Sequence, residues 1–406
     1  MTSGESGTAP MPPWDEGRRR FLTQASTALV GSALGGCSFG ALNTPSRAAP
    51  APALKLEPLR ASRDRITAIT VCTRPFRPQG PRLEVEPLLG KTIVHNYGHG
   101  GSGWSLSWGS SAIAGEKALA TGERQVAVIG CGAMGLTSAL LLQQAGAQVT
   151  VYAKELPPNV PSSLATGLWT PDSRICFAEY ATPAFKDMWQ RMARGSFATY
   201  QKLLGLPGTP VEFTDMYFVS DSAQMPDRAL APSDPRPRFA ELQRELTADL
   251  MTHGQDFAPG SHNLGARYLR RYSLLMFNLN GYSRMLMSEF RASGGKIEIE
   301  EFHTPADFAR IREKTLINAT GYGSRALFGD QSVVPVRGQV ARVIPEPQVD
   351  YGLIYRDVAF VPRRDGLVFQ VIGENDYYGF DDPSAVPNRA EAELAVDTIA
   401  GLFNPA

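Results

Sequence analysis

Apolar residues along the chain occur in two patterns, as short β-branched runs and as longer stretches with helical spacing. Short runs bounded by turn residues are typical of strands, whereas apolar positions three or four residues apart are typical of helices. The first pattern predicts strands at residues 65–71, 92–94, 124–130, 148–152, 268–277, 296–301, 314–318, 337–340, 354–362 and 366–373. The second predicts helices at residues 110–120, 136–145, 178–204, 281–292 and 388–402. The predicted fold class is therefore α/β, with mixed α+β character.

Three local expectations go with this pattern. Prolines fix φ and lack an N–H, so Pro75 is expected to end the first strand. Residues 222–263 are polar and rich in proline, and no element is predicted there. The spacing of the last helix places five residues on its inward face: Ala392, Leu394, Ala395, Thr398 and Ile399.

One predicted strand runs directly into a glycine motif, Gly130-Cys131-Gly132-Ala133-Met134-Gly135, which a helix follows. A strand, GxGxxG and a helix form the dinucleotide fingerprint, in which a pyrophosphate lies at the helix N-terminus. A carboxylate at the end of the next strand normally accepts the ribose hydroxyl. Lys154 and Glu155 stand there, which makes Glu155 the candidate.

A second glycine run, residues 95–105, contains four glycines in the six positions from Gly98 to Gly103. Glycines at this density allow the backbone to approach a ligand closely. A plain surface loop is the alternative, but strand-like residues precede the run and the GxGxxG motif follows it. Residues 161–169 are small and rich in hydroxyls, which suits a loop over a bound ring system.

Composition narrows the class of protein. The 406 residues are enough for two domains, and 40 basic and 40 acidic residues cancel. No bulk charge attracts nucleic acid, and no apolar run reaches the roughly 18 residues of a membrane span. The five histidines show no metal-ligand spacing, so no metal is predicted. Four cysteines include no CxxC, and whether Cys72 and Cys176 pair stays open.

The N-terminus is read as a targeting segment. Residues 17–22, with Arg18, Arg19 and Arg20, resemble a twin-arginine export motif, and Leu-Gly-Gly-Cys37 resembles a lipobox. An arginine-rich terminus without this role is the alternative. The expectation is a signal at 1–37, a linker at 38–61 and an exported protein, periplasmic or anchored to the membrane through a lipid on Cys37.

Several short sequence motifs together resemble those of the D-amino acid oxidase family of FAD-dependent oxidoreductases. They are His95 to Trp108, Val-Ile-Gly-x-Gly-x-x-Gly-Leu at 128–136, Val-Tyr-Ala at 151–153, Gly-Leu-Trp-x-Pro at 167–171, Asn-Ala-Thr-Gly at 318–321, Arg-Gly-Gln at 337–339 and Arg74-Pro-x-Arg-Pro with Arg-Leu-Glu at 82–84. Residues 124–402 resemble the family's N-terminal four-fifths and residues 62–120 its C-terminal fifth. The two blocks stand in exchanged order, as in a circular permutation.

The resemblance implies FAD as the cofactor, in a Rossmann-like FAD-binding domain beside a sheet-rich substrate domain. The implied FAD-binding domain is 88–175 and 264–332, and the substrate domain is 62–87, 176–263 and 333–406. The implied cofactor residues are Gly130, Gly132, Ala133, Met134, Gly135, Lys154, Glu155, Ser162, Ser163, Thr166, Gly167, Leu168, Phe302, Gly100, Gly101, Ser102, Gly103, Trp104 and Ser105.

The resemblance also implies a substrate site. Arg74 matches the arginine that pairs with the substrate carboxylate, Tyr355 a tyrosine that supports it, and Gly101 the glycine whose carbonyl accepts the amine. Three positions depart from the family: Lys154 replaces the ribose aspartate, Ala359 a second carboxylate-binding tyrosine, and Ser102 a bulky aromatic. An extra residue between Arg77 and Arg82 leaves the register of that segment open.

The implied reaction is oxidative deamination of a D-amino acid or related amine, by hydride transfer from Cα to flavin N5. It would give an imino or keto acid and, with O₂, hydrogen peroxide. A flavin dehydrogenase on a secondary amine or cyclic imino acid is one alternative. A flavin-retaining protein without turnover is another, suggested by Ala359. A nicotinamide dehydrogenase fits less well because residues 95–105 have no role in it. The side chain of the substrate, the electron acceptor and the oligomeric state stay open.

Overall fold

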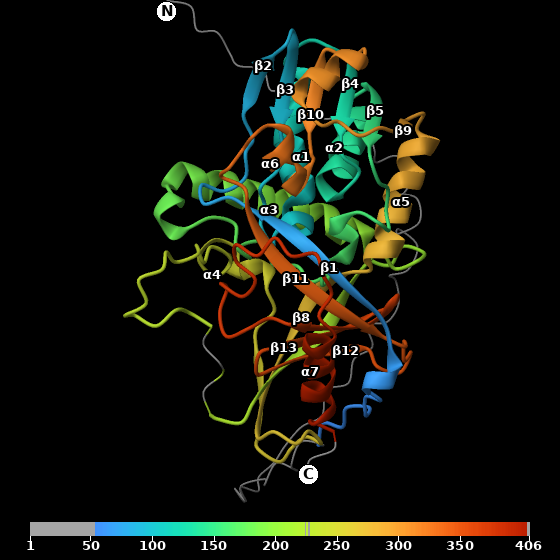
Figure 1. Cartoon of the computed structure of the whole chain (residues 1–406). Coiled ribbons are helices and arrows are strands. Elements are labelled where there is room, and N and C mark those ends of the chain that lie inside the picture. The colour runs from blue at the N-terminus through green and yellow to red at the C-terminus, as the bar shows by residue number, and fades with distance from the viewer. Residues whose placement is uncertain (1–52, 224, 226–227, 404–406) are drawn as a thin grey trace, which may run out of the picture. The chain divides into compact units, whose positions relative to one another are not determined.

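The glycine motifs belong to a six-stranded sheet in the computed structural model, which describes residues 53–223, 225 and 228–403 (Figure 1). In order across the sheet, its strands are β2 (Val85–Leu88), β3 (Lys91–His95), β10 (Thr315–Asn318), β4 (Gln125–Ile129), β5 (Gln148–Ala153) and β9 (Lys296–Ile299). Neighbouring strands run parallel, except β2 and β3. The carboxyl ends of the parallel strands therefore meet at one edge of the sheet.

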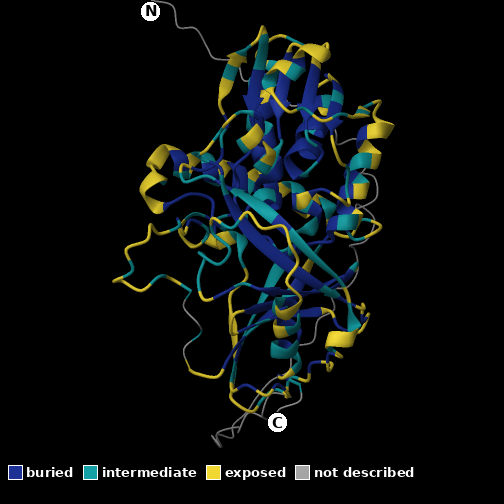
Figure 2. Ribbon diagram, viewed as in Figure 1, coloured by how far each residue is buried: buried dark blue, intermediate teal, exposed yellow. Residues whose placement is uncertain are grey.

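Helices cover both faces of this sheet. On one face α1 (Gly103–Leu119) and α2 (Ala133–Gln144) pack together, with α3 (Pro183–Leu203) against α1 and α5 (Leu279–Ala292) against α2. Side chains alternate along a strand, so Val126 and Val128 pack with these helices while Ala127 and Ile129 join the opposite core. That opposite core includes η5 (Pro305–Arg310) and α6 (Ser324–Leu327). Figure 2 shows the central strands buried and the outer helical surfaces exposed.

An eight-stranded sheet carries the other half of the described chain. In order, its strands are β1 (Ile66–Phe76), β11 (Val334–Val343), β14 (Gly366–Val371), β13 (Val358–Arg363), β12 (Tyr351–Tyr355), β6 (Val211–Ser220), β8 (Tyr268–Phe277) and β7 (Gln255–Phe257). Only β12 and β6 pair in parallel. Helix α7 (Arg389–Ala400) packs against one face, with Ala392, Ala395 and Ile399 in the core. Shorter helices are η1 (Arg63–Arg65), η2 (Pro161–Leu164), η3 (Ala178–Tyr180), α4 (Gln243–Leu246), η4 (Ala248–Leu250) and η6 (Gly321–Gly323).

The mixed α/β class and most predicted elements are confirmed, and three elements differ in extent. Strand β1 continues through Pro75, because it is an edge strand and a missing N–H on its outer side costs nothing. Helix α1 begins at Gly103 instead of residue 110, inside the glycine run. The predicted strand 354–362 is two strands, divided by a turn at Arg356, whose φ is +49°.

Other expectations also need correction. Leu394 does not face inward, since it is 58% exposed, and Thr398 is only half-buried, whereas Ala392, Ala395 and Ile399 are buried as predicted. Strand β6 was not predicted at all, and the polar segment 222–263 contains α4, η4 and β7. Cys72, Cys131 and Cys176 are buried and unpaired.

The predicted linker is partly packed. Leu56 and Leu59 are buried in the core beside α7, so this part of the chain is anchored rather than a free tether. The predicted export motif and Cys37 lie outside the described residues. Within the described residues, no helix combines the length and apolarity needed to cross a bilayer.

The two ends of the described chain meet at one segment. The Leu54 N–H donates to the Ser261 carbonyl at 2.7 Å, and the Gly265 N–H donates to the Leu402 carbonyl at 2.7 Å. Such proximity is what a permuted chain requires. The permutation and the boundaries of the two domains stay predictions. One strand crosses the predicted boundary: β8 lies in the predicted FAD-binding range but pairs in the eight-stranded sheet.

A relinked chain tests the permutation. Joining residue 403 to residue 53 through a short Gly/Ser linker, and opening the chain between Ala120 and Arg124, should give a folded protein. The opened turn is exposed and the joined ends are close. We expect the wild-type circular dichroism spectrum and a cooperative thermal transition. The matched control is the same linker with the chain opened inside β4, which should not fold. Aggregation of the first chain with every linker length would contradict the permutation.

Candidate active site

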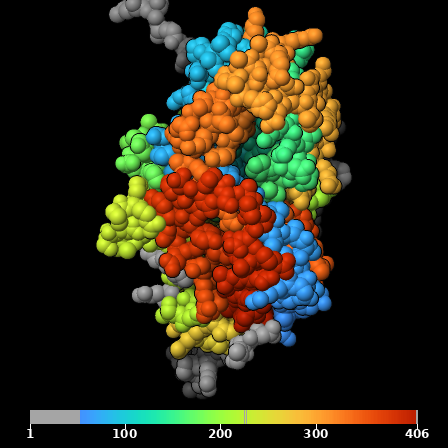
Figure 3. All heavy atoms as spheres, viewed as in Figure 1, coloured from blue at the N-terminus to red at the C-terminus, as the bar shows by residue number. Residues whose placement is uncertain are grey.

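A cavity of about 640 Å³ is lined by residues from both sheets. From the six-stranded sheet come the residues that follow β4, β5 and β10, at the carboxyl ends of parallel strands. Ligands of open α/β sheets bind at this edge. From the eight-stranded sheet come parts of β1, β12, β13 and β14. In the space-filling view, the C-terminal segments in red cover the middle of the face, directly below the orange segments near β10 and α6 (Figure 3).

The GxGxxG motif forms a cradle at the start of α2. Gly130 has φ +109°, and a Cβ there would lie 2.5 Å from the Ala319 carbonyl oxygen. A Cβ on Gly135 would lie 2.0 Å from the Gly130 carbonyl oxygen, so this glycine lets helix and strand touch. Gly132 opens onto the cavity, and the Ala133 N–H donates to Ser162 Oγ at 3.2 Å. This open helix N-terminus fits the pyrophosphate of FAD.

Charged residues gather at the end of the cavity beyond β5 and β9. They are Lys154, Glu155, Glu300, Glu301 and His303, with Phe302 among them. Lys154 Nζ lies 3.5 Å from the Glu301 carboxylate, so its charge is compensated locally. The Phe302 ring meets Tyr152 edge-on, with 6.0 Å between the ring centres. A flat ring and several carboxylates fit an adenosine, whose ribose needs a hydrogen-bond acceptor.

The second glycine run is fixed against residues 173–174. A Cβ on Gly100 would lie 1.9 Å from the Arg174 carbonyl oxygen, and the Gly101 N–H donates to the Ser173 carbonyl at 2.9 Å. Ser102 Oγ donates to the same Ser173 oxygen at 3.0 Å. The run therefore packs backbone on backbone, which explains why glycine is needed there.

The structure brings most of the predicted cofactor residues to the cavity. These are Gly130, Gly132, Ala133, Met134, Lys154, Glu155, Ser162, Thr166, Gly167, Leu168, Phe302, Gly100, Gly101, Gly103, Trp104 and Ser105. Three do not line it: Gly135 packs the helix on the strand, Ser102 fastens the loop, and Ser163 is fully buried.

Arg74 reaches the same cavity from β1. Its guanidinium lies over Gly338, where a Cβ would come within 2.4 Å of Nη1. Nη1 donates to the Arg337 carbonyl at 3.1 Å. Among the described residues, no carboxylate forms an ion pair with Arg74, so its charge is left for a ligand.

Tyr355 is not brought to the cavity. Its hydroxyl donates to the Asp221 carboxylate at 3.0 Å, and its ring belongs to the core beside α7. Because side chains alternate along β12, its neighbour Ile354 lines the cavity instead, opposite Ala359 of β13. The expectation that Tyr355 supports the substrate carboxylate is therefore corrected.

Several cavity residues were missed by sequence reasoning. They include Arg174, Arg228, Gln370, Asp376 and Tyr378. Each is distant in sequence from the glycine motifs, and no spacing rule marks it. Burial raises the pKa of Tyr378 to about 12, and its contact with Glu391 acts in the same direction.

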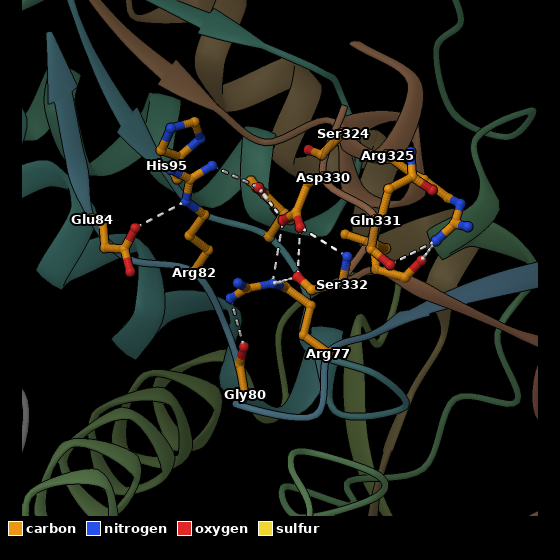
Figure 4. A network of polar contacts seen from close by, with 12 residues as sticks. Arg77, Gly80, Arg82, Glu84, His95, Ser324, Arg325, Asp330, Gln331 and Ser332 are labelled. Atoms are coloured by element: carbon orange, nitrogen blue, oxygen red, sulfur yellow. Dashed lines mark hydrogen bonds and ion pairs between the residues drawn. The ribbon is translucent and has the colours of Figure 1, made fainter. Parts of the chain in front are cut away.

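Arg77, Arg82, Asp330 and Ser332 belong to a separate polar network (Figure 4). Arg77 Nε donates to Ser332 Oγ at 2.9 Å and lies 3.3 Å from the Asp330 carboxylate. Tyr97 donates to Asp330 at 2.7 Å and accepts from Arg82 at 3.2 Å. Arg77 and Arg82 do not line the cavity, whereas Arg74 of the same segment does.

His99 lines the cavity but is fully desolvated. Its Nε2 lies 2.7 Å from Ser110 Oγ, and burial lowers its pKa to about 3. It is therefore neutral at ordinary pH.

The sequence model of the family described as FAD dependent oxidoreductase matches residues 125–406. A D-amino-acid oxidase of Rubrobacter xylanophilus is 25% identical over 283 residues, covering 68% of this chain and 76% of its own. A D-amino-acid oxidase of Streptomyces coelicolor is 26% identical over 279 residues, which cover 66% of this chain and 77% of that protein. The solved structure of iminodiacetate oxidase from Chelativorans sp. BNC1 has a TM-score of 0.47 at 15% sequence identity. The match covers 69% of this chain and 79% of that chain.

Gly132→Val should abolish flavin binding without unfolding the protein. The φ of Gly132 is −86°, which valine tolerates, but its side chain would occupy the cradle. We expect a wild-type circular dichroism spectrum and loss of the visible flavin absorbance. Gly281→Val is the control for a glycine replacement, because Gly281 is exposed, lies away from the cavity and has no atom closer than 3.6 Å to an added Cβ. Full flavin content in Gly132→Val would contradict the cradle.

His99 should make the protein less stable in acid. Its folded-state pKa, about 3, lies below the ordinary 6.5, so the unfolded state binds the extra proton between these values. The contribution of His99 to the free energy of unfolding is fully present above about pH 6.5. As the pH falls below that value, it is lost at up to about 1.4 kcal/mol per pH unit. Denaturant unfolding should show that the free energy of unfolding of His99→Gln falls less steeply in acid than that of the wild type. The control is His253→Gln, because His253 is exposed. An unchanged slope in His99→Gln would refute this role.

Proposed function

Because the chain belongs to the family of FAD-dependent oxidoreductases, we propose that it oxidatively deaminates a D-amino acid or a related amine. The observation that carries the proposal is Arg74, which lies without a described carboxylate partner in the cavity that both glycine motifs line. The D-amino-acid oxidases among the relatives support the same choice.

FAD is the cofactor, and the cavity offers it three groups of residues. Gly130, Gly132 and Ala133 would hold the pyrophosphate, Glu155 and its neighbours the ribose, and the run Gly100–Ser105 the ring system. When bound, FAD supplies an electron acceptor that takes a hydride from the substrate Cα.

The chain's own contribution is orientation. A guanidinium grips a carboxylate through two parallel hydrogen bonds, and this fixes a plane as well as a position. Arg74 would hold the α-carboxylate in this way, and the Gly101 carbonyl would accept a hydrogen bond from the amine. Two fixed points on the substrate determine where its Cα–H bond points, which is the larger part of such catalysis.

Among the described residues that line this end of the cavity, no side chain is free to act as a base. His99 is neutral but bound to Ser110, and Asp376 lies 3.3 Å from Arg174. The amine must therefore arrive unprotonated, and loss of hydride from Cα then leaves an iminium. Water converts it to the keto acid and ammonia. With O₂ as acceptor, the other product is hydrogen peroxide.

A dehydrogenase acting on a secondary amine is the second candidate. Ala359 favours it, because a small side chain opposite Ile354 leaves room for a substituent on the nitrogen. Such an enzyme would deliver electrons to a carrier instead of O₂.

We further propose that the enzyme is exported. The twin-arginine route moves folded proteins, which suits an enzyme that takes up its cofactor before export. Replacing Arg18 and Arg19 by Lys should retain the protein in the cytoplasm, and unchanged fractionation would reject this proposal.

Anaerobic bleaching separates the candidates. The purified yellow protein should lose its flavin colour with D-amino acids and keep it with their L-enantiomers. Bleaching only by secondary amines would favour the second candidate. A flavin that no amine or amino acid bleaches would overturn the proposed function.

Arg74→Ala should lower kcat/KM by about 30- to several-thousand-fold, because truncating one side of a buried charge pair costs roughly 2–5 kcal/mol. Flavin content should stay normal. Arg77→Ala is the matched control, since Arg77 is bound to Asp330 outside the cavity. Arg77→Ala should lower the free energy of unfolding by about 1–3 kcal/mol and leave kcat/KM unchanged. Unchanged kinetics in Arg74→Ala would remove the carboxylate clamp.

A further inference from the structure

Two further arginines, Arg174 and Arg228, line the cavity at the end that holds Arg74. They come from separate loops of the chain. The charges here are coupled, because Arg74 and Arg228 both disfavour the charge on Arg174 while Asp376 favours it. Asp376 and Asp357 both favour the charge on Arg228, but only Asp376 lines the cavity. Three guanidiniums and one carboxylate therefore line this end of the cavity, which carries an excess of positive charge.

Arg174 is held there at a conformational cost. Its φ is +50°, a left-handed value that non-glycine residues seldom adopt, and it is 9% exposed. Its Nε donates to the Asp376 carbonyl at 2.6 Å, and its Nη2 lies 3.3 Å from the Asp376 carboxylate. A strained and buried arginine facing a cavity is typical of a binding residue.

Arg228 has no ion-pair partner among the described residues. Its two terminal nitrogens donate to the backbone carbonyls of Gly373 and Ile372, the second at 2.9 Å. Backbone carbonyls compensate a buried charge only partly, and burial lowers the pKa of both Arg228 and Arg174. An anion placed between the two would relieve this cost.

We propose that the substrate carries a second carboxylate, bound by Arg174 and Arg228 while Arg74 holds the first. The inference rests on the proposed function and narrows its substrate class. Two carboxylates on the substrate would offset the charges of Arg74 and Arg228, neither of which forms an ion pair within the described residues, and the small Ala359 leaves space for the longer molecule. Acidic D-amino acids and N-carboxyalkyl amines share this chemistry.

Binding of unreactive acids tests the second subsite without turnover. Calorimetry on the holoenzyme compares malonate, succinate and glutarate with acetate, propionate and butyrate. We expect at least one dicarboxylate to bind about tenfold or more tighter than its monocarboxylate counterpart. Equal affinities would overturn the second subsite, whatever the enzyme's reaction is.

Substitutions then assign the subsite. Arg228→Met should reduce the dicarboxylate preference at least about tenfold, and Arg174→Met provides a second test if the first variant does not fold. The control is Arg236→Met, in the same loop: Arg236 pairs with Asp234, stacks over the Tyr377 ring and does not line the cavity. A preference that survives both cavity substitutions would overturn the assignment.

Anaerobic flavin reduction identifies the source of the second carboxylate. D-aspartate and D-glutamate are compared with D-alanine, and N-carboxymethyl-D-alanine with N-methyl-D-alanine. A higher kcat/KM for the acid of either pair supports the inference and shows which class is used. Faster reduction by D-alanine and N-methyl-D-alanine would overturn it and leave the proposed function intact. No reduction by any of them would overturn the proposed function, and the calorimetry would still decide the subsite.

Discussion

The contact between two backbones, at Gly100 and Arg174, is the constraint on which the site depends. No side chain fits between them, since a Cβ on Gly100 would overlap the Arg174 carbonyl oxygen. This contact holds the β3–α1 loop against the loop after residues 167–171, with hydrogen bonds from Gly101 and Ser102 to Ser173. It also fixes Arg174 in its strained conformation, facing the cavity. One close approach thus sets the wall of the cofactor site and the position of a cation.

The sequence predicts what depends on neighbouring residues. Strand, glycine motif and helix at Gly130–Gly135 are local, and the structure reproduces them. Tyr355 follows from the resemblance alone, which does not say which face of β12 it occupies: the structure places it in the core beside α7 and its neighbour Ile354 at the cavity. Pro75 was misjudged because its tolerance depends on β1 being an edge strand, which is a property of the sheet. Arg174 and Arg228 lie far apart in the sequence, and tertiary packing brings them to the same cavity. No local pattern could therefore predict that they lie close together.

The two ends of the cavity use charge differently. At the adenosine end Lys154 lies beside Glu301, and the surrounding carboxylates leave an acceptor-rich surface for neutral hydroxyls. At the other end the arginines are compensated mainly by backbone carbonyls. A partner without charge suits the first environment, and only an anion suits the second. The cavity therefore orients its contents by electrostatics as well as by shape.

The pairing of β1 with β11 has a consequence for how the protein matures. Residues 66–76 pair with residues 334–343, which the ribosome makes much later in the same chain. Until then β1 is an unpaired strand that other chains could join, and Arg74 has no fixed place. The family match at 125–406 omits this strand and the glycine run alike. A nascent chain thus remains exposed to misassembly, and cannot complete its substrate site, until residues 334–343 have been made.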